Sequence, residues 1–106
     1  VAGKICVLTD DMIDTGGTIV KAAEALMADG AAGVVIAATH AILSDPAVDR
    51  LKNSPAVEVI VTDTLPISED RRFDKLTILS IAPLVARAIR EVFDDGSVTS
   101  MFDGHA

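Results

Sequence analysis

Short runs of consecutive apolar residues alternate along this chain with longer segments in which apolar positions recur at helical spacing. Four runs, at residues 4–9, 34–39, 57–62 and 76–80, are rich in β-branched residues and predict strands. Apolar positions three and four apart predict helices over residues 15–29 and 81–93. A capping residue and a nearby proline predict a shorter helix over residues 44–52. This alternation predicts an α/β fold, a mostly parallel Rossmann-like sheet with helices on both faces.

Each of the two longer predicted helices has an apolar side that we expect to face the sheet. In the first helix this side comprises Ile19, Ala22, Ala23, Leu26 and Met27, and Gly30 is a natural end of the helix. In the last helix it comprises Leu84, Val85, Ala88, Ile89 and Val92. The second strand is apolar at nearly every position, which is typical of a strand covered on both faces. The charged residues 69–72, by contrast, predict a solvated surface loop.

Composition limits the classes of protein that the chain can belong to. Its 106 residues form one domain at most, and half of them are apolar, which supports a buried core. The net charge of −7, with three Phe and neither Trp nor Tyr, argues against a nucleic-acid partner. No apolar run is long enough to cross a membrane, and Cys6 is expected to be a buried small apolar residue. We therefore expect a soluble, cytoplasmic protein.

The polar residues that follow the first strand form the strongest candidate site. Asp14, Thr15, Gly16, Gly17 and Thr18 lie between this strand and the first helix. A glycine-rich turn at the start of a helix exposes backbone N–H groups at the positive end of the helix dipole, and threonine hydroxyls add donors. This combination predicts an anion site, most often for phosphate. A polar turn without a ligand is the alternative, because Asp and Gly are frequent in turns for conformational reasons.

Two adjacent carboxylates, Asp10 and Asp11, precede this turn at the end of the strand. Carboxylates accept hydrogen bonds from vicinal hydroxyl groups and are hard oxygen ligands for Mg²⁺. A phosphate site beside a diol-binding site is what a sugar phosphate requires. Ligands of parallel sheets bind at the carboxyl ends of the strands, where residues 39–40 and 62–64 are also expected. His40 at this edge is a candidate for ligand binding or for acid–base chemistry.

Residues 7–18 resemble the phosphoribosyl-pyrophosphate motif shared by type I phosphoribosyltransferases and ribose-phosphate pyrophosphokinases. That motif has four apolar residues, two acids and, after a few residues, Thr-Gly-x-Thr; Thr9 departs mildly from it. Residues 39–47 are similar to a Thr-His-x-x-Leu-Ser-x-x-Ala segment of the pyrophosphokinases, as are residues 62–64 and 97–102. Ordinary phosphoribosyltransferases do not share these segments. The resemblance is to the carboxyl-terminal part of the enzyme, so we expect residues 1–106 to form one phosphoribosyltransferase-like domain of a longer chain.

The resemblance implies a ribose-phosphate diphosphokinase, which transfers the diphosphoryl group of ATP to the C1 hydroxyl of ribose 5-phosphate and requires Mg²⁺. The 5-phosphate would bind to backbone amides and hydroxyls of Asp14, Thr15, Gly16, Gly17 and Thr18. Asp10 and Asp11 would bind the ribose 2- and 3-hydroxyls, directly or through Mg²⁺. Asp14 is also the candidate catalytic residue, orienting either the loop or the C1 hydroxyl.

The resemblance further implies regulation and assembly. Ser97, Val98, Thr99 and Phe102 match a segment that contributes to an inhibitory ADP site at a subunit interface; alternatively, Phe102 simply anchors the tail. The family assembles as hexamers built from dimers, and we expect this chain to self-associate as a homo-oligomer. The family's ATP pocket and catalytic basic loop lie upstream, so this chain is expected to be inactive alone.

Two other interpretations stay open. A non-catalytic synthetase-associated subunit would keep the sugar-phosphate site and serve regulation or assembly. A phosphoribosyltransferase would need a base-binding hood, which this sequence does not show. The intact pair Asp10 and Asp11 and the intact residues 15–18 favour the diphosphokinase.

Overall fold

The computed structural model describes residues 1–94. The four residues assigned above to an ADP site, Ser97, Val98, Thr99 and Phe102, lie outside the described residues. The described elements follow in chain order as β1 (Ile5–Ile13), α1 (Gly17–Ala28), β2 (Gly33–Ala41), α2 (Ala47–Lys52), β3 (Glu58–Thr62), a 3₁₀ turn (Glu69–Arg71), β4 (Leu76–Leu79) and α3 (Ala82–Phe93).

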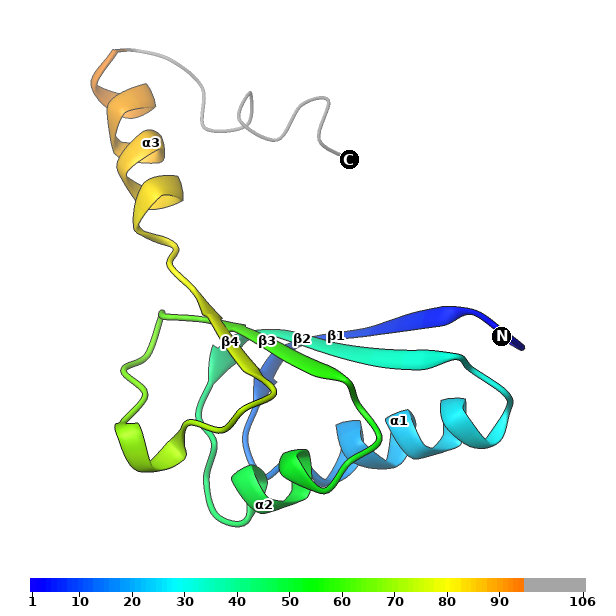
Figure 1. The fold of residues 1–106 in the computed structure, drawn as a ribbon. Coiled ribbons are helices and arrows are strands. Elements are labelled where there is room, and N and C mark those ends of the chain that lie inside the picture. Colours follow the sequence, from blue (N-terminus) through cyan, green and yellow to red (C-terminus); the bar gives the residue numbers. More distant parts are fainter. Residues whose placement is uncertain (95–106) are drawn as a thin grey trace.

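The four strands form one sheet in the order β1-β2-β3-β4, and every pair is parallel (Figure 1). The register places Asp10 beside Ala38 and Met12 beside His40. Each connection between neighbouring strands runs from the carboxyl end of one strand to the amino end of the next, as parallel pairing requires. The predicted α/β class and parallel sheet are thereby confirmed.

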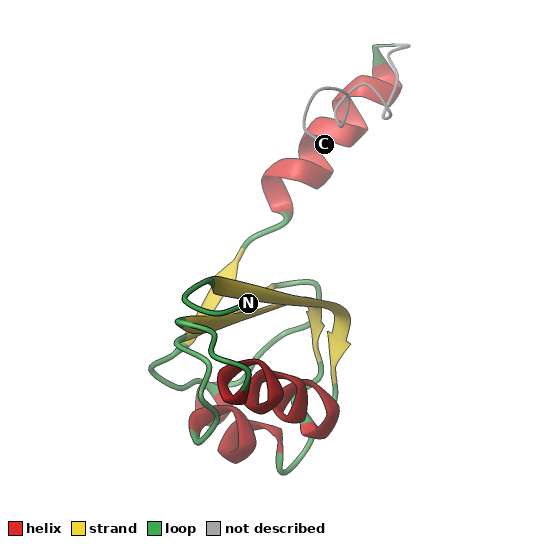
Figure 2. Cartoon of the chain, turned by 90° about the vertical axis from the view of Figure 1, so that its right-hand side faces the viewer, coloured by secondary structure: helices red, strands yellow, loops and turns green. Residues whose placement is uncertain are grey.

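Helices α1 and α2 lie on the same side of the sheet (Figures 1 and 2). Val34, Ile36, Val59 and Val61 point toward this side and are at most 1 % exposed. Leu51 of α2 is completely buried among them, and the half-buried Cys6 packs against the same cluster. The core therefore lies between one face of the sheet and two helices.

The opposite face of the sheet is not covered by a helix in the described part of the chain (Figure 2). Its residues in β1 include Ile5 and Val7, which are 63 % and 60 % exposed. In β2, Val35 and Ala37 on this face are only half-buried, while their neighbours are buried. The sequence predicted helices on both faces of the sheet. Within residues 1–94 helices cover only one face, so the prediction was wrong for the other face.

The last helix, α3, extends away from the sheet beyond β4 (Figure 1). It contains no buried residue, and Leu84, Val85, Ile89 and Val92 are 45–64 % exposed. The prediction that its apolar side packs inward on this sheet was wrong. Helical periodicity identifies which side of a helix is apolar, but it does not identify the surface that covers that side.

Two strands are longer than the sequence predicted. β1 extends to Ile13 and β2 to Ala41, because the two strands continue to pair through Met12–His40 and Ile13–Ala41. Asp10, Asp11 and His40 therefore lie within the ends of strands and not in the loops that follow. Among the described helices, none has the length and apolar character needed to cross a membrane.

Candidate functional site

The turn between β1 and α1 forms a small concavity at the carboxyl end of β1. Gly16 has φ +79°, a left-handed conformation that glycine adopts without steric cost, and the helix begins at the next residue. The cavity holds about 170 Å³. It is lined by the last residues of β1, the turn and the first turn of α1, namely Asp10, Met12, Ile13, Asp14, Thr15, Gly16, Gly17, Thr18 and Ile19.

The backbone amides of this turn are available to a ligand. Within residues 1–94, the N–H groups of Gly16, Gly17, Thr18 and Ile19 donate to no protein acceptor, and the first turn has no side-chain cap. The amide of Val20, one residue later, already donates to the carbonyl oxygen of Gly16 at 3.1 Å. Unpaired amides at the start of a twelve-residue helix combine hydrogen-bond donors with the positive end of its dipole. The arrangement suits an anion.

Asp10 and Asp11 differ in their relation to this cavity. Asp10 lines it, whereas Asp11 does not, because successive side chains of a strand point to opposite faces. Hydrogen bonding with Asp11, through its side chain and through its amide, which donates to Asp10 Oδ1 at 2.7 Å, lowers the pKa of Asp10 below its usual 3.8. Asp10 is therefore an ionised acceptor at neutral pH.

A second hollow of about 240 Å³ lies over the carboxyl ends of β1, β2 and β3, and Asp10 borders both hollows. Its far side carries Thr39 and Thr62, whose hydroxyl donates to the carbonyl oxygen of Thr39. His40 lies nearby, with Nδ1 2.8 Å from the hydroxyl oxygen of Thr64. The residues predicted at the ligand edge of the sheet, from three separate strands, are thus brought to one edge.

Helix α2 supports the outer side of the turn, which the sequence did not indicate. A Cβ added to Gly16 would lie 3.7 Å from the Cα of Ala47. Arg50 Nη1 donates to the carbonyl oxygen of Thr15 at 3.2 Å. The only sequence signal for this contact was an arginine on the next predicted helix, because 35 positions separate the two residues.

A second arginine was wrongly assigned to a solvated loop. Arg71 donates to the carbonyl oxygen of Leu43 and lies 3.1 Å from the Asp45 carboxylate. Asp45 therefore binds Arg71, and helix α2 begins only at Ala47 without a side-chain cap. The neighbouring Glu69, Asp70 and Arg72 are exposed, as predicted.

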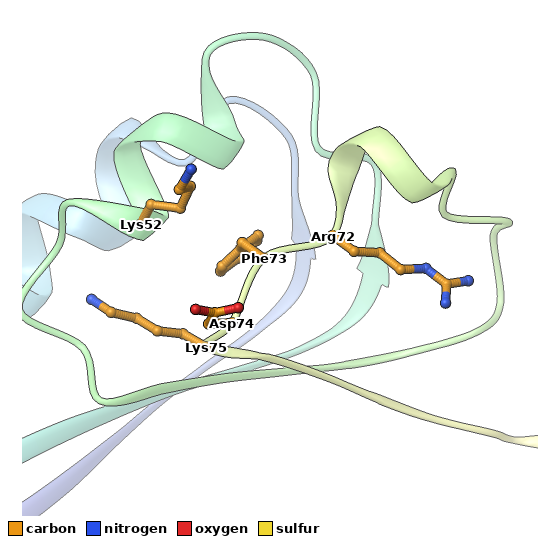
Figure 3. Close-up of a pocket in the computed structure, with 5 residues that line it drawn as sticks. All are labelled: Lys52, Arg72, Phe73, Asp74 and Lys75. Atoms are coloured by element: carbon orange, nitrogen blue, oxygen red, sulfur yellow. The ribbon is translucent and has the colours of Figure 1, made fainter.

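A larger hollow of about 340 Å³ lies between α2 and the start of β4, away from the turn (Figure 3). Lys52, Phe73, Asp74 and Lys75 gather there, while the guanidinium of Arg72 points away from them. Lys75 Nζ already donates to the carbonyl oxygen of Ser54 at 2.8 Å. Because Asp74, Lys52 and Lys75 all line it, this hollow has mixed charge.

The described residues do not by themselves form a complete metal site. Within residues 1–94, no three His, Cys, Asp or Glu side chains lie close enough together to hold a metal ion. The carboxylates of Asp10 and Asp11 are nevertheless hard oxygen ligands of the type that Mg²⁺ binds. Because Asp10 lines the cavity and Asp11 points to the other face of the strand, an ion held at Asp10 would take its remaining ligands from substrate and water.

The parallel sheet, whose first strand leads through a glycine turn into a helix, defines an α/β protein of the class in which ligands bind at the carboxyl ends of the strands. The sequence model of one family, the phosphoribosyl synthetase-associated domain, matches residues 1–103. The chain belongs to this family.

Individual relatives agree with this assignment. The ribose-phosphate pyrophosphokinase of Mycobacterium tuberculosis strain H37Rv is 65 % identical over 106 residues, all of this chain and 32 % of the relative. That of Streptomyces coelicolor is 63 % identical over 103 residues, 97 % of this chain and 32 % of the relative. The crystal structure of phosphoribosylpyrophosphate synthetase from Mycobacterium smegmatis matches with a TM-score of 0.85 at 64 % identity.

That match covers 91 % of this chain and 32 % of the solved chain. The chain therefore spans about a third of the length of the relatives that it matches. The resemblance to ribose-phosphate pyrophosphokinases inferred from residues 7–18 and 39–47 is confirmed at the level of the family.

Proposed function

We propose that this chain forms the ribose 5-phosphate-binding part of a ribose-phosphate diphosphokinase. The observation that carries the proposal is the turn at residues 14–18, where unpaired amides at the start of α1 line a cavity bordered by the Asp10 carboxylate. A phosphate at the amides leaves the sugar ring near Asp10, where its hydroxyl groups meet an ionised acceptor. The identity of 65 % to a ribose-phosphate pyrophosphokinase supports the same assignment.

The residues have separable roles in this proposal. Gly16, Gly17 and Thr18 bind the 5-phosphate through amides, and Thr15 and Thr18 add hydroxyl donors. Asp10 accepts from the ribose hydroxyls, and Asp11 assists from the other face of the strand. Asp14 borders the same cavity, and we assign it the orientation of the turn or of the C1 hydroxyl.

In the reaction of the whole enzyme, the C1 oxygen of ribose 5-phosphate forms a bond to the β-phosphorus of ATP. The bond between that phosphorus and the oxygen bridging to the α-phosphorus breaks, AMP leaves, and the C1 hydroxyl loses its proton. Phosphoryl transfer depends mainly on positioning and on neutralisation of charge. When bound, Mg²⁺ supplies that neutralisation, and Asp10 and Asp11 are the residues here that would hold it through the ribose hydroxyls.

The charges of the chain bear on which of the two substrates it binds. The acidic balance of −7 is unfavourable for a triphosphate, and Arg50 is the one cationic side chain hydrogen-bonded to residues 14–19 within the described residues. We therefore propose that this chain binds ribose 5-phosphate and that ATP binding and transfer require other parts of a longer enzyme. A homo-oligomeric state and an inhibitory ADP site that includes Ser97, Val98, Thr99 and Phe102 belong to the same proposal.

Calorimetric titration with ribose 5-phosphate, with and without Mg²⁺, tests the sugar site. The unchanged chain is expected to bind, and the Asp10→Asn/Asp11→Asn variant to lose binding while remaining folded by circular dichroism. Asp74→Asn, which removes an exposed carboxylate far from the turn, is the control and should bind normally. Absence of binding by the folded, unchanged chain would overturn the proposal, as would undiminished binding by the double variant.

A further inference from the structure

The contact between Arg50 and Thr15 joins two parts of the chain that lie 35 positions apart. Arg50 is on α2, and its Nη1 donates to the carbonyl oxygen of Thr15 at 3.2 Å. Ala47, at the start of the same helix, is completely buried and lies next to Gly16. Helix α2 thus contacts the turn through a packed small residue and through a charged donor.

This contact fixes the orientation of one peptide group. No residue of α2 lines the 170 Å³ cavity, so α2 lies on the outer side of the turn. The Thr15 carbonyl points to Arg50 and hence away from the cavity. In a trans peptide the N–H points opposite to the C=O, so the Gly16 N–H points toward the cavity.

The missing side chain of Gly17 leaves the space for Arg50. A Cβ added at Gly17 would lie 3.0 Å from Arg50 Nη1 and 3.7 Å from its Cζ, so the guanidinium would have to move. Gly16 has φ +79°, but Gly17 is the first residue of α1 and needs no unusual backbone conformation. Glycine at position 17 therefore matters because it leaves room for the Arg50 guanidinium.

The charge of Arg50 is also uncompensated. Within residues 1–94 the ion pairs are Arg71–Asp45 and Arg72–Glu69, so Arg50 pairs with no described carboxylate within 4 Å. The cavity itself is bordered by two carboxylates, Asp10 and Asp14. A cation bonded to the turn offsets part of their repulsion for a phosphate.

We infer that Arg50 is a positioning residue for the phosphate site, holding the Thr15–Gly16 peptide with its amide directed into the cavity. This inference rests on the proposed function, since it names the group that prepares the same site. Arg50 acts through the peptide and does not itself touch the ligand.

The test compares Arg50→Met, Arg50→Lys and Lys52→Met in the 106-residue chain. Lys52→Met is the matched control, because it removes the same charge from the same helix on the side that faces Phe73 and Lys75 (Figure 3). Residual dipolar couplings report the orientation of the Gly16 N–H bond. Titrations with ribose 5-phosphate and with inorganic phosphate report affinity, and urea unfolding reports stability.

In Arg50→Met we expect the Gly16 coupling to change and the affinity for ribose 5-phosphate to fall on the order of tenfold. Stability and the couplings of core amides should stay the same, which separates positioning from a structural role. Lys52→Met should change neither the coupling nor the affinity. Arg50→Lys should restore affinity only as far as it restores the Gly16 coupling.

Unchanged Gly16 coupling in Arg50→Met would overturn the inference. So would Arg50→Lys binding normally with an altered coupling, because charge alone would then explain the effect. If the unchanged chain binds neither ligand, the proposed function fails, while the coupling still decides whether Arg50 orients the peptide.

Discussion

Arg71 donates a hydrogen bond to the backbone carbonyl of Leu43, a residue 28 positions earlier in the chain. Leu43 is 1 % exposed and has φ +54°, a conformation that is unfavourable for a side chain with a Cβ. The same guanidinium reaches Asp45, so one side chain holds both ends of the bend that leads from β2 to α2. Since α2 contacts the turn at residues 14–18, the stability of this bend bears on the candidate site.

Arg71→Met is expected to lower the free energy of unfolding by about 1–3 kcal/mol, because it leaves the carbonyl oxygen of the buried Leu43 without its charged donor. Urea denaturation monitored by circular dichroism measures this change. Arg72→Met is the control: its ion pair with Glu69 spans 3.6 Å between side chains that are 50 % and 90 % exposed. That pair should contribute less than about 1 kcal/mol. Equal losses for the two variants would contradict the assignment.

Gly17→Ala should disturb the proposed phosphate site through Arg50, because the new Cβ would lie 3.0 Å from Nη1. We expect weaker binding of ribose 5-phosphate in Gly17→Ala. Both changes remove the same contact, that of Arg50 with Thr15. The double variant Gly17→Ala/Arg50→Met should therefore bind ribose 5-phosphate about as weakly as the weaker-binding of the two single variants. Additive losses in this double-mutant cycle would show that the two residues act independently.

The start of α3 should depend on pH through Asp63. The Ile81 amide donates to Asp63 Oδ1 at 2.9 Å, and this bond, with a smaller one from Ser80, lowers the pKa of Asp63 below 3.8. A lowered pKa in the folded state means that the interaction stabilises the fold above the ordinary pKa. It is lost as the pH falls through the lower value.

The Ile81 amide resonance should accordingly titrate with a midpoint below 3.8. In Asp63→Asn the same amide should exchange faster with solvent at neutral pH, whereas Asp74→Asn should leave it unchanged. A midpoint at or above 3.8 would show that the carboxylate does not hold the helix start.

Exposed apolar residues on α3 should drive self-association of this chain with a second copy. Leu84, Val85, Ile89 and Val92 share one side of the helix, and Phe93 is 84 % exposed. Apolar patches of this kind usually mark an interaction surface. Ile89→Glu should therefore reduce the mass measured by light scattering, while Arg90→Glu on the opposite side of the helix should not. A monomeric unchanged chain at high concentration would contradict the prediction.

The local parts of the fold could be predicted from the sequence. Strand and helix order follow from the period of apolar residues, and the turn at residues 14–18 joins a strand to a helix within a few positions. The residues of this candidate site are neighbours along the chain, so their types and spacing already indicated an anion. The roles of these residues in binding stay predictions.

Only the tertiary structure decided which distant residues meet. Arg50 with Thr15, Arg71 with Leu43 and His40 with Thr64 are separated by 35, 28 and 24 positions, and their contacts depend on how the elements pack. The same holds for the extended ends of β1 and β2, where continued pairing overrides polar residues that predicted a loop. The position of α3, which has no buried residue, was likewise decided only by the tertiary structure. A sequence states which side of an element is apolar, whereas the geometry of the assembled elements determines what lies against that side.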